Sequence, residues 1–162
     1  KFSLFTSGHR NPQGLHFDGE FIFETEHGLV GGDELNILYE GNDYGWPFET
    51  YGKEYSTNSW PLNENDGFHL KSFQPKFSWI PSIGISDLTK IPDSSLSPWR
   101  GDIIVSSLSS RSINRIRFSK DGNLQNIENI IINYRIRSIE YHDESLYFIS
   151  DNEGLMGIVT IN

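Results

Sequence analysis

The sequence predicts an all-β fold, and composition, strand spacing and the scarcity of helical periodicity all support that class. Alanine is absent from the 162 residues, whereas isoleucine and the aromatic residues are plentiful. Because alanine favours helices while β-branched and aromatic residues favour strands, this composition indicates β-structure. AT-rich coding is an alternative source of part of the isoleucine enrichment.

Short apolar or alternating runs recur with turn-forming residues between them, which is typical of a sandwich, barrel or propeller. A 3.6-residue apolar period over about 11 residues is hard to find. The first runs are separated by "DG", "HG", "GG" and "GND", and "KDGN" predicts a turn at 120–123. In chain order, the expected strands lie in 2–7, 14–18, 20–26, 33–41, 75–80, 84–91, 101–108, 112–119, 127–134, 136–143, 145–151 and 156–162.

A weak internal repeat favours the propeller. An acid-bearing turn stands before a strand in "FDGEFIF", "SKDGNL" and "HDESLYF", and comparable units are spaced roughly by one four-stranded blade. We therefore expect one partial domain over 1–162, with blades at about 1–47, 75–119 and 120–162. The polar and aromatic stretch 48–74 lacks a period and is expected to be a long loop. On this pattern alone, a β-sandwich remains equally open.

Charge and composition exclude several classes of protein. The net charge of −9 argues against a nucleic-acid surface and against adsorption to an anionic membrane. Without cysteine, neither a disulfide nor a thiolate metal site can form. No apolar run approaches the ~18 residues of a membrane span. The chain opens on the strand-like "KFSLFTS", which we interpret as the start of a piece of a longer protein.

Four motifs near the start resemble the glucose/sorbosone dehydrogenase family: "GHRNPQGL", "ETEHG", "GGDELN" and "GNDYGWP". "WIPSI", "WRGDIIVSSL" and "RIRSIEYHDESLYFISDNEG" follow in the family's order. The resemblance covers nearly the whole chain but only the family's C-terminal half. It implies a six-bladed β-propeller that uses pyrroloquinoline quinone (PQQ) with Ca²⁺. It also implies a periplasmic or secreted protein that, at full length, oxidises the anomeric C1 hydroxyl of a sugar to a lactone.

By the same resemblance, four residues would serve the cofactor. Arg10 would act catalytically by polarising the quinone carbonyl, and Asn11 would hold the cofactor's edge. Arg135 and Arg137 would bind the PQQ carboxylates; two residues apart on a strand, they share one face. The alternatives are an arginine–acid pair that fixes a corner at Arg10, and an exposed strand face near Glu140.

The resemblance also implies two calcium sites. The carbonyl groups of Gly28 and Leu29 would bind the active-site ion, although the family commonly has proline at the second position. The carboxylate of Glu34 and the carbonyl of Tyr44 would bind a structural ion. Calcium accepts such oxygen ligands. The alternative for Asp33 and Glu34 is a solvated acidic turn.

Two departures from the family pattern stand out. Ser109 replaces the usual lysine of the cofactor pocket, and Arg111 is a candidate to compensate for the lost charge. The family's catalytic base is a histidine of the N-terminal half, which this chain does not contain. The histidines that are present are expected to be structural or at the surface: His9, His16, His27, His69 and His142.

Two other functions remain as alternatives. One is a non-catalytic propeller module that binds carbohydrate or a protein partner and keeps only structural calcium. The other, a lactonase-type hydrolase, needs convergent acids and asparagine on calcium, which the sequence does not show. Because three blades do not close a ring, we expect apolar flanks covered by a second copy in a homodimer or by the missing N-terminal half.

Overall fold

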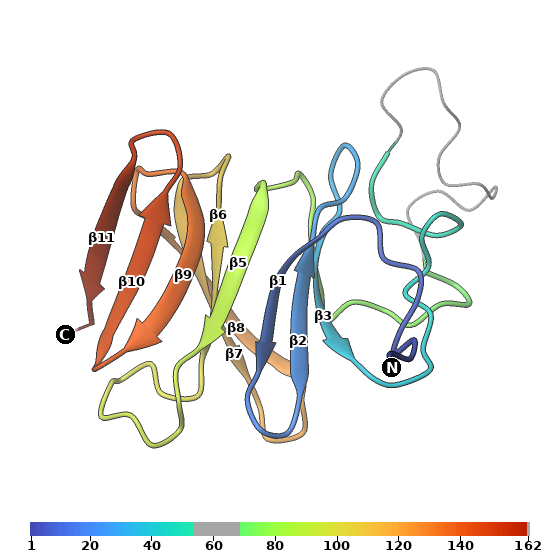
Figure 1. Ribbon diagram of the computed structural model, residues 1–162, viewed down its shortest axis with the longest axis horizontal. Helices are drawn as coiled ribbons and strands as arrows, with labels where there is room; N and C mark the ends of the chain where they lie inside the picture. Colours follow the sequence, from blue (N-terminus) through green and yellow to red (C-terminus); the bar gives the residue numbers. More distant parts are fainter. Residues whose placement is uncertain (54–68, 162) are drawn as a thin grey trace. The chain divides into compact units, whose positions relative to one another are not determined.

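The computed structural model describes residues 1–53 and 69–161, which form two compact units, Lys1–Ile83 and Gly84–Asn162 (Figure 1). Eleven strands pair in three antiparallel sheets over the described residues, so the prediction of an all-β fold is confirmed. Within the described part of the chain, no helix has the length and hydropathy needed to cross a bilayer.

The first unit contains one sheet of four strands in chain order. The β1–β2 turn is fixed by Asp18, whose Oδ1 accepts the amides of Glu20 and Phe21 at 2.9 and 2.7 Å. The strands are β1 (Pro12–Phe17), β2 (Ile22–Glu26), β3 (Asp33–Leu38) and β4 (Phe77–Trp79). The segment between β3 and β4 includes residues 54–68, which lie outside the described part of the chain.

The second unit contains two sheets, and their shared core is aliphatic. The sheets consist of β5 (Ile85–Lys90), β6 (Ile103–Ser107), β7 (Ser112–Phe118) and β8 (Leu124–Ile131), and of β9 (Ile136–His142), β10 (Ser145–Ser150) and β11 (Leu155–Thr160). Side chains of both sheets form one buried cluster: Ile91, Ile104, Ile113, Ile136, Ile139, Leu146 and Phe148. Inward isoleucines supply most of this core, and the same strands also bury polar residues such as Ser86, Ser106 and Asn114.

The sheets divide the chain differently from the expected blades. The hydrogen-bonded sheets span 12–79, 85–131 and 136–160, instead of 1–47, 75–119 and 120–162. The reason is that the long 48–74 segment connects β3 to its own neighbour β4, and the "KDGN" turn connects β7 to its own neighbour β8. The run 2–7 forms no strand and makes only one parallel bridge, Ser7 to Asp43.

A buried carboxylate anchors the second unit. Asp102 is fully buried, and its two oxygens accept from Arg115 Nε at 2.5 Å and from Arg117 Nε at 2.6 Å. Arg115 also lies 5.0 Å from the ring centroid of Trp99. Because both arginines project from one face of β7, one carboxylate fixes that face to the loop before β6.

Another buried carboxylate anchors the loops of the first unit. Glu49 accepts hydrogen bonds from the Ser72 hydroxyl at 2.5 Å, the Ser72 amide at 2.9 Å and the Lys71 amide at 3.1 Å. Burial raises the pKa of Glu49, but these hydrogen bonds outweigh burial and lower the pKa to about 2. The ionised carboxylate therefore holds the segment that carries His69.

We expect Asp102→Asn to lower the free energy of unfolding by about 3 kcal/mol. The substitution keeps the shape but leaves two arginines without their counter-charge, and breaking a buried pair costs about 3–5 kcal/mol. The lower end applies because the Arg117 side chain is 40% exposed. Urea unfolding monitored by tryptophan fluorescence measures the loss, with Asp121→Asn at an exposed turn as the control. Equal stabilities of the two variants would contradict this role.

We expect Glu49→Gln to remove part of the acid sensitivity of the first unit. The pKa of Glu49 is depressed in the folded chain, so its stabilisation is present above the unfolded pKa of about 4.3. That stabilisation is lost as the pH falls toward about 2. The stability difference between wild type and variant should therefore shrink between pH 5 and 2 in urea titrations. The exposed Glu40→Gln is the control, and its stability should run parallel to that of wild type over this pH range. Parallel behaviour of Glu49→Gln would show that Glu49 does not contribute to the acid sensitivity.

Candidate functional site

Polar side chains cover one face of the first sheet. Glu24 pairs in register with Asn36, and Glu26 pairs with Glu34. Because residues two apart on a strand share a face, all four side chains project to the same side. Each is at most 4% exposed. We call Glu24, Glu26, Glu34 and Asn36 the carboxylate cluster.

Asn36 lies at the centre of the carboxylate cluster. Its amide nitrogen donates to Glu24 at 3.0 Å, to Glu26 at 3.4 Å and to Glu34 at 3.5 Å. Burial raises the pKa of Glu24 well above its ordinary value, and the charge of Glu26 adds to the shift. Burial also raises the pKa of Glu34. A cation beside the cluster would reverse both shifts, because it favours the ionised form.

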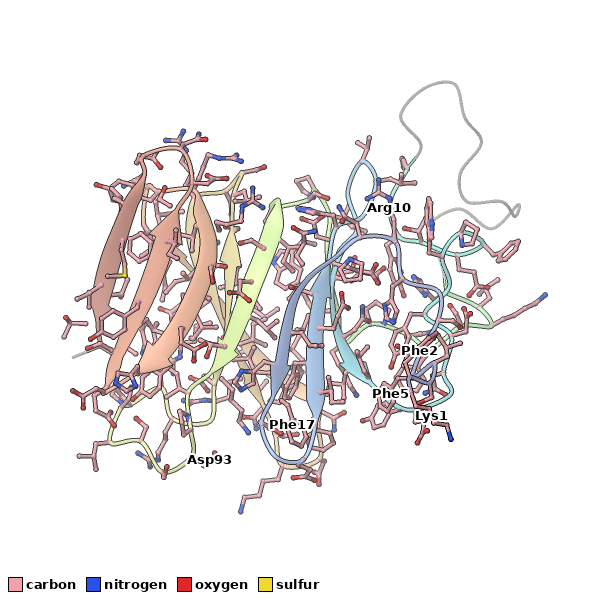
Figure 2. The ribbon with its side chains drawn as sticks, viewed as in Figure 1. Lys1, Phe2, Phe5, Arg10, Phe17 and Asp93 are labelled. Carbon is pink, nitrogen blue, oxygen red and sulfur yellow. The ribbon has the colours of Figure 1, made fainter. Side chains whose placement is uncertain are left out.

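Glu26 holds the loop that carries Arg10 and Asn11. Its Oε2 accepts the backbone amide of Arg10 at 2.6 Å and that of Asn11 at 3.3 Å. The Arg10 guanidinium donates from Nη1 to the carbonyl groups of His27 at 3.1 Å and Gly28 at 2.7 Å. Figure 2 marks Arg10 among the side chains of the first unit. The structure thus brings together Arg10 and Gly28, two of the residues that the sequence predicted for the site.

Gly28 occupies a position where no side chain fits. A Cβ there would collide with the carbonyl oxygens of Gly31 and Gly32. Its amide donates to Asp33 Oδ1 at 3.1 Å, and the next residue, Leu29, is only 7% exposed. The Gly28 carbonyl is therefore held in place from both sides. It accepts from Arg10, but a carbonyl oxygen has two lone pairs and retains capacity for a second partner.

A small cavity of about 10 Å³ lies beside these groups. It is bordered by several of the predicted ligands, Gly28, Glu34 and Tyr44, together with Glu26, Glu49 and His69. This volume corresponds to about one water-sized sphere. The cavity therefore has the size of a single ion or water molecule, and its lining combines acidic residues with Arg10, His27 and His69.

Two histidines contact the carboxylate cluster, which the sequence analysis did not anticipate. His69 is 3% exposed, places Nε2 3.3 Å from Glu34 Oε1, and pairs its Nδ1 with the Ser72 hydroxyl at 2.8 Å. His9 places Nδ1 3.4 Å from Glu26 Oε1 and stacks on Tyr44 at 4.7 Å between ring centroids. Both imidazole rings therefore lie against the carboxylate cluster.

The arginine pair of the second unit shares one carboxylate. Arg135 Nε lies 3.3 Å from Asp151 Oδ1, and Arg137 Nη2 lies 2.8 Å from Asp151 Oδ2. The hydrogen bond from Arg137 is the main cause that lowers the pKa of Asp151. The two guanidinium groups therefore lie on one side of the sheet, and the acid they contact is Asp151, not Glu140.

Ser109, which replaces the family's usual lysine, and Arg111, the candidate to compensate for it, lie in the connection between β6 and β7. Both residues are exposed. Ser109 lies against Gly84, where an added Cβ would meet its hydroxyl at 2.5 Å. Gly84 itself has a φ of 64°, a conformation that glycine adopts easily. A lysine at position 109 would have to direct its long side chain away from this contact.

The sequence analysis missed Glu24, Glu26, Asn36, Glu49 and His69. A signal for the first three was present in "FETE" and "DELN", where polar residues alternate within apolar strands. Alternation alone assigns such residues to the solvent side of a strand. Burial of that side comes from the loops that cover it, and these lie far away in the sequence.

Comparison with known proteins identifies a family for this arrangement. The family described as glucose / sorbosone dehydrogenase matches residues 1–157. An uncharacterised protein of Synechocystis is 33% identical over 91% of this chain and 36% of its own length. Aldose sugar dehydrogenase YliI of Escherichia coli is 29% identical over 75% of this chain and 34% of its own length. Quinoprotein glucose dehydrogenase B of Acinetobacter calcoaceticus is 46% identical over 27% of this chain and 9% of its own length.

Solved structures agree with the sequence comparisons. The apo-form of soluble aldose sugar dehydrogenase from Escherichia coli superposes with a TM-score of 0.84 at 27% identity, over 96% of this chain and 46% of that one. The chain thus spans about a third to a half of the length of these relatives. Its three small antiparallel sheets match, so the prediction of a partial β-propeller is confirmed. Together, these matches show that the chain belongs to the glucose/sorbosone dehydrogenase family.

Proposed function

We propose that this chain supplies cofactor-binding and metal-binding parts of a PQQ- and calcium-dependent aldose sugar dehydrogenase. The observation that carries the proposal is the contact between the Arg10 guanidinium and the Gly28 carbonyl beside an oxygen-lined cavity. Two relatives named as an aldose sugar dehydrogenase and a quinoprotein glucose dehydrogenase support the same chemistry. The substrate is a sugar, and the product is the lactone formed at its anomeric carbon.

Oxidation of an anomeric hydroxyl removes a proton from oxygen and a hydride from carbon. PQQ, when bound, supplies the two-electron acceptor for that hydride. Arg10 would hold positive charge near the quinone oxygen, because Gly28 and His27 fix its guanidinium group. Asn11, fixed through its backbone by Glu26, would bind the cofactor's edge. The base that takes the hydroxyl proton is proposed to be a histidine outside this chain.

The arginine pair fits a carboxylated cofactor. Each guanidinium has five N–H donors, and Asp151 accepts only part of that capacity. Arg137 is 46% exposed, so its remaining donors are accessible. Asp151 would hold both groups in position, and the PQQ carboxylates would then bind them bidentately. Arg135 and Arg137 are therefore proposed as cofactor ligands.

The calcium assignments fit the first unit. The cavity bordered by Gly28, Glu34 and Tyr44 has the size of one ion, so at most one of the two proposed calcium ions would lie in it. The Gly28 carbonyl would have to share its lone pairs between Arg10 and the ion, and Leu29 would add its own carbonyl. Burial raises the pKa of Glu34, and a nearby cation would favour its ionised form. A periplasmic or secreted location, which the family resemblance implied, is part of the proposal.

A second candidate is a non-catalytic module that binds carbohydrate and keeps only structural calcium. Ser109 favours it, because an exposed serine stands where the family pattern has a lysine in the cofactor pocket. The two candidates differ in one measurement, which is PQQ-dependent reduction of a dye by the full-length protein with glucose or another aldose. Calcium binding without dye reduction would favour the module.

We expect Arg137→Ala to weaken PQQ binding by the full-length protein about tenfold to a hundredfold. A hydrogen bond to a charged group contributes about 1.5–3 kcal/mol, and every 1.4 kcal/mol is tenfold in affinity. Titration of PQQ against intrinsic fluorescence measures the change, and Arg100→Ala, at an exposed arginine of the same unit, is the matched control. Wild-type affinity in Arg137→Ala would show that the pair only balances Asp151.

We expect Ca²⁺ to raise the melting temperature relative to a chelator, because an ion that binds only the folded state stabilises it. Glu34→Gln should abolish most of that rise, since it removes the charged ligand, whereas the exposed Glu40→Gln should keep it. Differential scanning calorimetry measures the melting temperature in about 1 mM Ca²⁺ or in chelator. Matched ionic strength separates specific binding from the screening of surface charges by salt. Identical wild-type curves in both buffers would remove the calcium sites from the proposal.

A further inference from the structure

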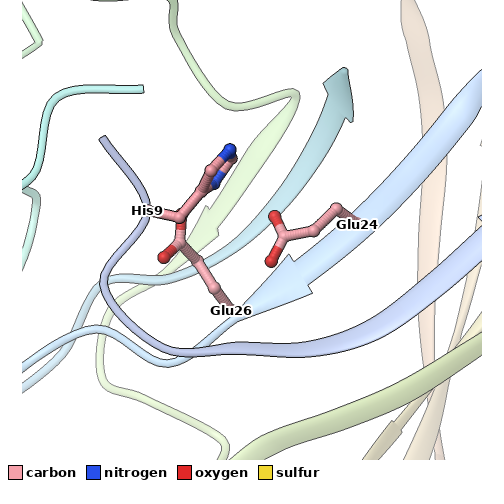
Figure 3. A group of neighbouring side chains, drawn as sticks. All are labelled: His9, Glu24 and Glu26. Atoms are coloured by element: carbon pink, nitrogen blue, oxygen red, sulfur yellow. The ribbon is translucent and has the colours of Figure 1, made fainter. Parts of the chain in front are cut away.

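We propose a second divalent-cation site, formed by His9, Glu24 and Glu26, that takes a transition-metal ion such as Zn²⁺ or Mn²⁺. Figure 3 shows the three side chains directed toward one another. One ligand atom from each lies within 4.8 Å of the others. Tetrahedral ligands about 2.1 Å from one ion lie about 3.4 Å apart, so a pair of atoms at the 4.8 Å limit would have to close by about 1.4 Å, through rotation of the glutamate side chains as the ion binds.

Two buried acceptor atoms point to a missing partner of positive charge. Glu24 Oε1 and Asn36 Oδ1 make no hydrogen bond within residues 1–53 and 69–161. Glu24 is 3% exposed and Asn36 is fully buried, so bulk water does not solvate these oxygens. A buried acceptor without a donor costs about 1–3 kcal/mol, and more when it is charged. In Figure 3 the Glu24 carboxylate faces Glu26 and His9, so a cation between the three side chains would lie beside this carboxylate.

The polar neighbours single out Glu24 within the carboxylate cluster. Glu26 and Glu34 each have an imidazole ring nearby, His9 at 3.4 Å and His69 at 3.3 Å. Arg10 directs its guanidinium to backbone carbonyls. The Glu24 carboxylate accepts a hydrogen bond from the side-chain amide of Asn36, which is neutral. A metal ion between Glu24, Glu26 and His9 supplies the charge that this position lacks.

His9 is oriented for metal binding. Its Nε2 pairs with the Thr6 hydroxyl at 2.9 Å, while Nδ1 faces the carboxylates. Stacking on Tyr44 at 4.7 Å fixes the plane of the ring. Metal-binding histidines usually engage their second nitrogen in such a hydrogen bond, which sets ring orientation. The ring is therefore positioned by groups that would not themselves touch the ion.

The ligand set separates this site from the proposed calcium sites. Calcium takes oxygen ligands, whereas one imidazole with two carboxylates suits Zn²⁺ or Mn²⁺. His9 and Glu24 border a cavity of about 230 Å³, whereas Glu26 borders the smaller cavity beside Glu34 and Tyr44, so Glu26 lies between the two sites. That larger cavity gives an ion access to His9 and Glu24. The inference does not rest on PQQ binding or on sugar oxidation.

Equilibrium dialysis of the purified chain with Zn²⁺, and separately with Mn²⁺, tests the site. Wild type should bind one ion that Glu24→Gln binds at least about tenfold more weakly, since loss of even an outer contact costs about 10–100-fold. His9→Phe, which keeps an aromatic ring against Tyr44, should show the same loss. Glu20→Gln, at an exposed turn of the same hairpin, controls for surface binding.

Melting temperatures separate a metal effect from a folding defect. In chelator, Glu24→Gln should be at least as stable as wild type, because a neutral amide replaces a buried carboxylate. In Zn²⁺, only wild type and Glu20→Gln should gain stability. Equal Zn²⁺ and Mn²⁺ binding by wild type and Glu24→Gln would overturn the site. Loss of Ca²⁺ binding in Glu24→Gln would also overturn it, because the cluster would then hold one shared calcium ion.

Discussion

The buried carboxylate cluster is the constraint on which the first unit depends. Carboxylates are rarely fully buried without partners. Here they tie separate segments together: Glu26 holds the backbone of Arg10 and Asn11, and Glu34 meets His69 from the far end of the long loop. An apolar face would bury area at lower cost, but it would not fix the position of a guanidinium group or border an ion-sized cavity. The sheet's polar face therefore exchanges stability for a defined geometry, and the cations proposed above would recover part of that stability.

The second unit compensates its buried charge in a different way. Its two sheets share a core of isoleucine, leucine and phenylalanine, and the inward side chains need no polar partners. Its one fully buried aspartate within the described residues, Asp102, is compensated inside the fold by Arg115 and Arg117. Charge near the candidate cofactor site is instead kept at the surface, where Arg135 and Arg137 flank Asp151. The buried charge of Asp102 is thus balanced within this unit, and Arg135 and Arg137 remain partly exposed.

These two arrangements suit the proposed division of labour in a sugar dehydrogenase. A calcium ion needs fixed oxygen donors in a confined space, and Gly28 of the first unit would offer its carbonyl as one of them. A cofactor with several carboxylates needs accessible planar cations, which the second unit provides. The family membership of the chain connects the two requirements, since its relatives include an aldose sugar dehydrogenase and a quinoprotein glucose dehydrogenase.

The sequence by itself determined the all-β class, eleven of the twelve expected strands and the family, because alternation, turn residues and ordered motifs are local signals. It placed Arg135 and Arg137 on one face because period-two geometry follows from strand structure alone. Only the tertiary structure decided which strands share a sheet, since a turn has the same composition within a sheet as between sheets. Only the tertiary structure showed that Glu24, Glu26 and Asn36 are buried, because alternating polar residues of a strand are normally exposed. The segments that cover this face come from other parts of the chain: 6–11, 44–49 and 69–73. Burial depends on what covers a strand, and no pattern within the strand itself records that.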